Sequence, residues 1–200
     1  SYSMLAHGKV CEKCAGGAYF HCFREGCVKD SRAKSLLNTL EMYLHHKILH
    51  IYDLVDVFIS PSRFLKDKVQ AMGFKGRIEV LPNFVDPGDF VPQYGAAEQS
   101  ICYVGRLSKE KGVATLIDAM KSLPGVRLKV IGDGSLRGEL EEKCRNDGMT
   151  NVTFLGYQSG EDLKREISNS LFLVIPSEWY ENNPRSVIEA FALGKPVVGA

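Results

Sequence analysis

The sequence predicts an α/β fold over residues 101–200, a parallel sheet with helices on both faces. Two observations predict it: short apolar runs alternate with stretches of helical periodicity, and glycine ends several of the apolar runs. Strands that alternate with helices in this way pair in parallel through right-handed crossovers. Residues before 101 follow a different pattern, which indicates part of a second domain.

The expected elements of this region follow one another in order. We expect strands at 101–104, 127–131, 152–155, 171–175 and 196–198. The helices between them are expected at 113–123, 135–146, 161–168 and 184–193. The first helix has its apolar residues at 113, 116, 117 and 120, the spacing of one helix face. The chain stops as the last strand ends, so we expect an incomplete sheet.

The residues before 101 are expected to hold the end of a different domain. The expected elements there are a helix at 36–51, a strand at 55–59, a helix at 61–73 and a strand at 78–81. Proline, glycine and polar residues are frequent at 86–100, which is typical of a linker. The predicted organisation is 1–85 as the end of the first domain, 86–100 as the linker and 101–200 as the ligand-binding domain.

The composition excludes several classes of protein. With 44% apolar residues, 24% charged residues and a net charge of +1, it is close to that of an average globular protein. It has no basic excess, so we expect no nucleic-acid partner. No apolar stretch approaches the roughly 20 residues of a transmembrane helix, and the start lacks the features of a signal peptide. We therefore expect a cytoplasmic protein in which the isolated Cys102 and Cys144 are buried thiols.

The loop 105–112 follows the first strand of the second domain and carries two cations, Arg106 and Lys111. Ligands of such sheets bind beyond the carboxyl ends of the strands, where this loop lies. Gly105 lets the backbone approach a ligand closely, and the next helix offers free N–H groups to the same place. Two cations in this position can bind a diphosphate from two sides. The alternative is a solvated basic turn.

The segment 176–190 runs from a strand end into a helix and carries two carboxylates. Asn183 and Pro184 are a favourable N-cap and first helical residue, so the positive end of the helix is expected to face the ligand. Glu181 precedes the helix, and Glu189 lies among apolar residues within it. A carboxylate there is costly without partners, which favours a ligand. The alternatives are a solvated loop residue for Glu181 and a surface position on an amphipathic helix for Glu189.

Together these motifs resemble glycosyltransferase family 4 in their order and spacing, over roughly residues 55–200. The upstream motifs are Ser60-Pro61-Ser62-Arg63-Phe64 and Leu81-Pro82-Asn83-Phe84-Val85-Asp86. The downstream motifs are Gly105-Arg106 with Lys111-Gly112, Gly132-Asp133-Gly134, Phe154-Leu155-Gly156, Pro176-Ser177, and two glutamates separated by seven residues ahead of Gly194-Lys195-Pro196-Val197-Val198.

The resemblance implies a two-domain GT-B fold with a Rossmann-like donor domain, here truncated and preceded by a fragment of the N-terminal domain. It implies a retaining enzyme that transfers a sugar from a UDP- or GDP-sugar to a glycan or lipid-linked acceptor, in surface polysaccharide or glycolipid synthesis. No cofactor or divalent metal is required, because cations and a helix end supply the positive charge. The acceptor-site residues are expected upstream of Ser1, so we expect this chain to be inactive alone. The whole protein is expected to be cytoplasmic, with peripheral contact at the inner face of the membrane.

The resemblance also implies a role for each matching residue. Arg106 and Lys111 hold the donor diphosphate and stabilise the charge that develops on it as the glycosidic bond breaks. Glu181 binds hydroxyls of the transferred sugar and completes the catalytic set, and Glu189 binds the ribose hydroxyls. The backbone at 156–157 flanks the base. The expected donor-binding residues are Gly105, Arg106, Lys111, Gly132, Gly156, Tyr157, Glu181, Asn182, Asn183 and Glu189.

Two features qualify this interpretation. The family often has Gly-Phe-Gly after the first glutamate, where this chain has Asn182-Asn183-Pro184, so the transferred sugar is not predicted. A nucleotide-sugar epimerase has a similar fold and cleaves the same bond without a sugar acceptor. The loop with Arg106 and Lys111 and the glutamate pair favour a transferase over that alternative.

Four cysteines between residues 11 and 27 form a separate motif. The first two have the Cys-x-x-Cys spacing of zinc sites, and four thiolates would make a closed structural site. The spacing between the pairs is short for a zinc ribbon, so a metal site, free thiols and disulfides remain alternatives. With a metal, residues 7–30 would form a non-catalytic interaction module. The candidate ligands are Cys11, Cys14, Cys22 and Cys27, with His7 and His21 as substitutes.

Overall fold

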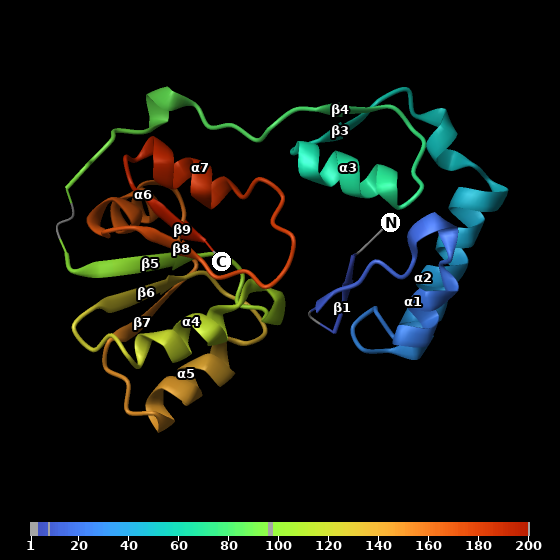
Figure 1. Ribbon diagram of the computed structural model, residues 1–200. Coiled ribbons are helices and arrows are strands. Elements are labelled where there is room, and N and C mark those ends of the chain that lie inside the picture. Colours follow the sequence, from blue (N-terminus) through green and yellow to red (C-terminus); the bar gives the residue numbers. More distant parts are fainter. Residues whose placement is uncertain (1–3, 8, 96–97, 200) are drawn as a thin grey trace. The chain divides into compact units, whose positions relative to one another are not determined.

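The computed structural model describes residues 4–7, 9–95 and 98–199 (Figure 1). The chain divides into two compact units, of which the first ends at Pro82 and the second begins at Asn83. Residues 86–100, predicted as a linker, belong to the second unit. Within that unit the Gln93 N–H donates to the Leu193 carbonyl oxygen at 2.9 Å. Within the described ranges, no helix has the length and apolar character that crossing a membrane requires.

The first unit combines a short hairpin, a helical region and a strand–helix–strand unit. Its strands are β1 (Leu5–Ala6), β2 (Lys9–Val10), β3 (Phe58–Ser60) and β4 (Ile78–Val80). Its helices and helical turns are η1 (Ala15–Gly17), α1 (Phe20–Glu25), α2 (Arg32–Tyr43), η2 (Leu44–Ile48), η3 (Ile51–Leu54) and α3 (Arg63–Ala71). β1 and β2 pair in antiparallel fashion, and β3 pairs in parallel with β4. Ser62 begins α3 by accepting a hydrogen bond from the Leu65 N–H at 3.0 Å.

The long helix predicted at 36–51 is interrupted in the structure. The α-helix α2 begins earlier, because Ser31 caps it by accepting from the Lys34 N–H. It ends at Tyr43 and passes into the π-helical turn η2. His50 then has a φ of +47°, a left-handed conformation that cannot continue a right-handed helix. The strand predicted at 55–59 begins only at Phe58.

The second unit is a five-stranded parallel sheet with the strand order β7-β6-β5-β8-β9 (Figure 1). Its strands are β5 (Ser100–Val104), β6 (Arg127–Ile131), β7 (Val152–Gly156), β8 (Leu173–Ile175) and β9 (Val197–Gly199). Its helices and turns are η4 (Pro87–Asp89), η5 (Lys109–Lys111), α4 (Val113–Met120), α5 (Arg137–Asn146), α6 (Gly160–Asn169) and α7 (Arg185–Ala192). The predicted α/β fold and its parallel strands are confirmed.

Helices cover both faces of this sheet, and each face has its own core. Successive residues of β5 point to opposite faces, so Tyr103 packs with α4 and α5, and Cys102 packs with α6 and α7. Leu116 and Ile117 of α4 are buried on the first face, and Ala190 of α7 is fully buried on the second. The two cores hold the strands in place, and the loops at the strand ends are therefore supported by rigid elements.

Candidate functional site

The loops after β5 and β8 meet at the carboxyl edge of the sheet. These strands are neighbours at the point where the chain order reverses, which is where ligands bind in open α/β sheets. The Glu178 N–H donates to the Glu110 carbonyl oxygen at 2.9 Å and joins the two loops. Gly112 has a φ of +65°, and a Cβ built on it would lie 1.8 Å from the Pro176 carbonyl oxygen. Only glycine fits there, so the two loops form one site.

A carboxylate and an ammonium group pair at the centre of this site. Glu181 Oε1 lies 2.6 Å from Lys111 Nζ, although 70 residues separate them in the sequence. Both side chains are 21% exposed. Burial raises the pKa of the Glu181 carboxyl, but hydrogen bonds from Lys111 and Ser177 outweigh it and hold the pKa below its ordinary value. The carboxylate is therefore ionised at neutral pH, and the predicted cation and predicted carboxylate lie together.

Ser177 and Trp179 also contact this carboxylate; from the sequence, Ser177 was only part of a motif and neither residue was assigned a role. The Ser177 hydroxyl donates to Glu181 Oε1, and the Trp179 indole N–H donates to the same oxygen at 3.2 Å. The Trp179 ring centroid also lies 5.2 Å from Lys111 Nζ. The available signal was that Trp179 is the chain's single tryptophan and follows a strand end.

Arg106 lies at the start of the first loop, and its side chain is exposed. The buried Tyr103 hydroxyl donates to the Arg106 carbonyl oxygen at 2.8 Å and fixes the backbone at this point. Burial raises the pKa of Tyr103, so its hydroxyl keeps the proton that it donates. Over the ranges that the structure describes, no ion pair involves the Arg106 guanidinium. The backbone of Arg106 is thus held in place, and its guanidinium is available to bind an anion.

Three predicted glycines lie at the same edge of the sheet. The Gly105 N–H donates to the Ile131 carbonyl oxygen, and the Gly132 N–H donates to the Gly156 carbonyl oxygen at 2.7 Å. A Cβ on Gly132 would lie 1.9 Å from the Gly105 carbonyl oxygen, so the first two backbones are in direct contact. Gly156 ends β7, and the next side chain, Tyr157, is 77% exposed. The edge therefore combines closely packed glycine backbones with one exposed aromatic ring.

Glu189 lies on α7 and lines a cavity of about 360 Å³. The side chain of Glu189 is 18% exposed, and its Oε1 lies 3.5 Å from the guanidinium of Arg185, one helical turn earlier. The Arg185 side chain is 69% exposed, so the pair is open to water. The other lining residues are Phe84, Val85, Asp86, Asp89, Phe90, Gly160, Leu163, Lys164, Ile167 and Leu193.

The two asparagines after Glu181 belong to the loop before α7 and do not cap this helix. Asn183 has a φ of +56°, and its carbonyl oxygen accepts a hydrogen bond from the Asn83 side chain at 2.8 Å. Pro184, not Asn183, occupies the N-cap position of α7, and no side chain caps this helix. The predicted N-cap at Asn183 is therefore wrong, because its left-handed backbone turns the chain one residue before the helix begins. Asn182 is half-buried in the same loop.

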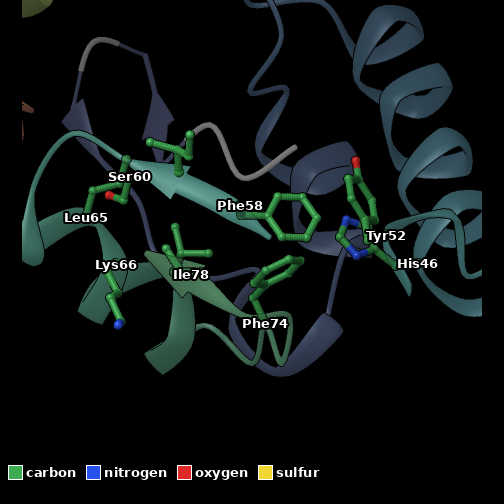
Figure 2. A pocket seen from close by; sticks show the side chains of 10 residues that line it. His46, Tyr52, Phe58, Ser60, Leu65, Lys66, Phe74 and Ile78 are labelled. Atoms are coloured by element: carbon green, nitrogen blue, oxygen red, sulfur yellow. The ribbon is translucent and has the colours of Figure 1, made fainter. Parts of the chain in front are cut away.

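A second cavity, of about 220 Å³, lies within the first unit (Figure 2). His46 stacks on Tyr52 with ring centroids 4.3 Å apart, and Phe58 meets Phe74 edge to face at 4.9 Å. Burial lowers the pKa of His46, which favours the neutral imidazole. Lys66 is the one cation of its lining. This apolar cavity is less suited to a diphosphate than the edge of the second unit.

All six cysteines are free thiols, and Cys22, Cys102 and Cys144 are buried. The buried thiols predicted at Cys102 and Cys144 are confirmed, and burial raises the pKa of Cys102 to about 11. Within residues 4–7, 9–95 and 98–199, no three His, Cys, Asp or Glu side chains are arranged to hold a metal ion. The zinc site predicted from Cys11, Cys14, Cys22 and Cys27 is not supported, nor is a zinc-binding module at 7–30. Of the three alternatives, the structure contains free thiols.

Comparison with known proteins places the chain in a family. The family described as glycosyl transferases, group 1, matches residues 92–200, just over half of the chain. An uncharacterized glycosyltransferase of Methanocaldococcus jannaschii is 38% identical over 177 residues, which are 76% of this chain and 45% of that protein. The lipopolysaccharide core biosynthesis glycosyltransferase LpsE of Rhizobium meliloti is 29% identical over 150 residues, 72% of this chain and 43% of that protein. The chain thus spans less than half the length of these relatives.

Solved structures show the same fold. A sucrose-phosphate synthase of Thermosynechococcus elongatus matches with a TM-score of 0.64 and 27% identity, over 72% of this chain and 40% of that one. HepE of Anabaena, solved in complex with UDP and glucose, matches with a TM-score of 0.65 and 21% identity, over 83% of this chain and 48% of that one. The similarity indicates the GT-B fold. By the family match and by the parallel sheet that carries the site, the chain belongs to the group 1 glycosyl transferases.

Proposed function

We propose that the second unit binds a UDP- or GDP-sugar at the carboxyl ends of β5 and β8. The observation that carries this proposal is the Lys111–Glu181 ion pair, which joins the loops after β5 and β8, with the exposed Arg106 at the start of the first of these loops. In this proposal the two cations bind the diphosphate and stabilise its charge as the bond to the sugar breaks. Glu181 binds hydroxyls of the sugar. The mechanism needs no divalent metal, because Arg106 and Lys111 supply the positive charge.

The nucleoside half of the donor is assigned to the glycine-lined edge of the sheet and the cavity beside Glu189. The half-buried carboxylate of Glu189 is suited to accept hydrogen bonds from ribose hydroxyls. In this proposal the backbone at Gly156 and Tyr157 flanks the base, and the exposed ring of Tyr157 lies beside it. Gly105 and Gly132 let the backbone approach the ligand, and Asn182 and Asn183 shape the loop that carries Glu181.

We further propose that the whole protein is a retaining enzyme of glycosyltransferase family 4. In this proposal the first unit is the end of the acceptor domain, and the acceptor is a glycan or a lipid-linked glycan in surface polysaccharide or glycolipid synthesis. The protein would work in the cytoplasm, at the inner face of the membrane, and this chain would be inactive alone. Proton NMR of the product anomer, made with a full-length relative and a nucleotide-sugar panel, tests retention: an inverted anomer contradicts it.

A thermal-shift screen of the 200-residue chain tests the donor site. We expect UDP or GDP, or their sugars, to raise the melting temperature more than NAD does. A ligand that binds only the native state stabilises it by roughly 2.7 kcal/mol at a hundredfold excess over its dissociation constant. A shift with NAD and none with any nucleoside diphosphate would contradict the proposal.

A further inference from the structure

Glu181 Oε1 receives three hydrogen-bond donors in the structure. Lys111 Nζ lies at 2.6 Å, the Trp179 indole nitrogen lies at 3.2 Å, and the Ser177 hydroxyl also donates to this atom. A carboxylate oxygen has two lone pairs, so three donors exceed the number that it accepts with good geometry. The contacts of Lys111, Ser177 and Trp179 all end on Oε1. None of these three contacts involves Oε2, which is therefore the candidate oxygen for a ligand.

Binding of the nucleotide-sugar would change the number of hydrogen bonds that Oε1 accepts. If a diphosphate draws the Lys111 ammonium away, Ser177 and Trp179 remain, and two neutral donors match the two lone pairs of Oε1. Both residues precede Glu181 by four residues or fewer in the same loop, which the Glu178 N–H ties to the Glu110 carbonyl oxygen at 2.9 Å. The carboxylate would keep its position while its charge becomes available to the sugar.

We propose that Ser177 and Trp179 are positioning residues for the donor sugar, holding Glu181 in place when the diphosphate takes Lys111. The inference rests on the proposed donor site. It assigns the recognition of sugar hydroxyls to Glu181 Oε2 and the orientation of that oxygen to two residues that touch no substrate. The Trp179 ring, 5.2 Å from Lys111 Nζ, keeps the ammonium near the carboxylate until the diphosphate binds.

The test measures the contribution of the sugar to affinity separately from that of the nucleotide. Isothermal titration of the chain with UDP, UDP-glucose, UDP-galactose, GDP and GDP-mannose gives, for each pair, the ratio of the dissociation constant of the diphosphate to that of its sugar. Trp179→Phe keeps the ring and removes the N–H, and Ser177→Ala removes the hydroxyl. We expect each variant to reduce this ratio about three- to tenfold, the range for one neutral hydrogen bond, with the affinity for the diphosphate unchanged within about twofold.

Two further variants control for general damage to the loop. Ser177→Thr keeps a hydroxyl and is expected to restore the ratio. Thr115→Val removes a hydrogen bond to Glu178 in the same loop, 2.6 Å long, without touching Glu181, and is expected to leave the ratio unchanged. Thermal melting of each variant shows that it is folded, and Ser177→Ala answers the question even if Trp179→Phe does not fold.

Each other outcome overturns the inference. Equal losses for a diphosphate and its sugar mean that Ser177 and Trp179 support the loop or Lys111 instead. An unchanged ratio in both variants means that Glu181 needs neither of them. If the parent binds diphosphates and no sugar adds affinity, Glu181 has no sugar to recognise, and the inference fails while the nucleotide site stands. If the parent binds no nucleotide, the proposed function fails as well.

Discussion

Glu181 and Glu189 are almost equally shielded from water, yet their surroundings differ. Their side chains are 21% and 18% exposed. Glu181 is held by Lys111, Ser177 and Trp179, whereas the ion pair of Glu189 is with the exposed Arg185 at 3.5 Å. The region around Glu181 is thus organised before a ligand arrives, and the region around Glu189 is an open cavity. In the proposed donor site, one end fixes the geometry of the reacting bond and the other only has to bind a nucleoside.

The largest effect is expected at the organised end. Lys111→Ala and Arg106→Ala should each weaken binding of a nucleoside diphosphate by roughly 1.5 to 3 kcal/mol, the typical value for a charge-assisted hydrogen bond, and barely change nucleoside binding. Titration calorimetry with UDP and uridine, or GDP and guanosine, measures both. Lys109→Ala, an exposed lysine of the same loop, is the matched control. Equal losses for nucleoside and diphosphate would assign these residues to the fold instead.

A smaller effect is expected at the open end. Glu189→Gln keeps the shape and one acceptor oxygen, so we expect nucleotide affinity to fall about tenfold, roughly 1.4 kcal/mol. Because Arg185 is 69% exposed, the lost ion pair should change the stability of the ligand-free chain by less than about 0.5 kcal/mol. The urea midpoint and the dissociation constant, measured on one variant, check both. A destabilised chain with normal affinity would remove Glu189 from the site.

The pH dependence of stability should report the charge of Glu181. The folded-state pKa of Glu181 lies below its ordinary value of 4.5, so the carboxylate contributes stability above that pH. This contribution is lost as the pH falls through the lowered folded-state pKa. We therefore expect the parent to exceed Glu181→Gln in urea midpoint at pH 7 and the gap to narrow below about pH 4.5. A gap that is constant from pH 7 to pH 3 would mean that the charge of Glu181 does not stabilise the fold.

The smallest effect is expected for Arg185→Ala. An exposed ion pair within one helix contributes about 0.3–0.5 kcal/mol, so the melting temperature should change little, and less still at high salt. Nucleotide affinity should stay within about twofold of the parent, because Arg185 is not among the proposed donor-binding residues. A tenfold loss would make the open end a charged site with Arg185 as a ligand-binding residue.

The sequence predicted the second unit better than the first because periodicity reports which residues face a core. The strand predicted at 127–131 has these bounds in the structure, and the helix predicted at 113–123 begins at Val113 and ends at Met120. The apolar spacing at 36–51 does not indicate the break, because the left-handed residue is the exposed His50, which takes no part in that spacing. Periodicity therefore predicts elements and leaves their ends to backbone conformations that it does not report.

The candidate site shows the same limit. Lys111 and Glu181 were predicted separately, as a cation after one strand and a carboxylate after another, and the parallel topology brings such loops to one edge. That they touch, and that Ser177 and Trp179 join them, depends on a hydrogen-bond geometry that no local pattern encodes. The prediction of Asn183 as an N-cap was wrong for a related reason, because its bond to Asn83 depends on a segment 100 residues away.

The contact between Gly112 and Pro176 has a consequence for engineering donor preference. A Cβ at position 112 would lie 1.8 Å from the Pro176 carbonyl oxygen, so any side chain there separates the two loops. The separation would pull Lys111 away from Glu181, since each lies within five residues of this contact. Loops 105–112 and 176–184 are therefore one transplantable module. In a chimera that exchanges only one of these loops with a relative, the two loops would not fit each other at this contact. A chimera that exchanges both keeps the ammonium and the carboxylate within hydrogen-bond distance.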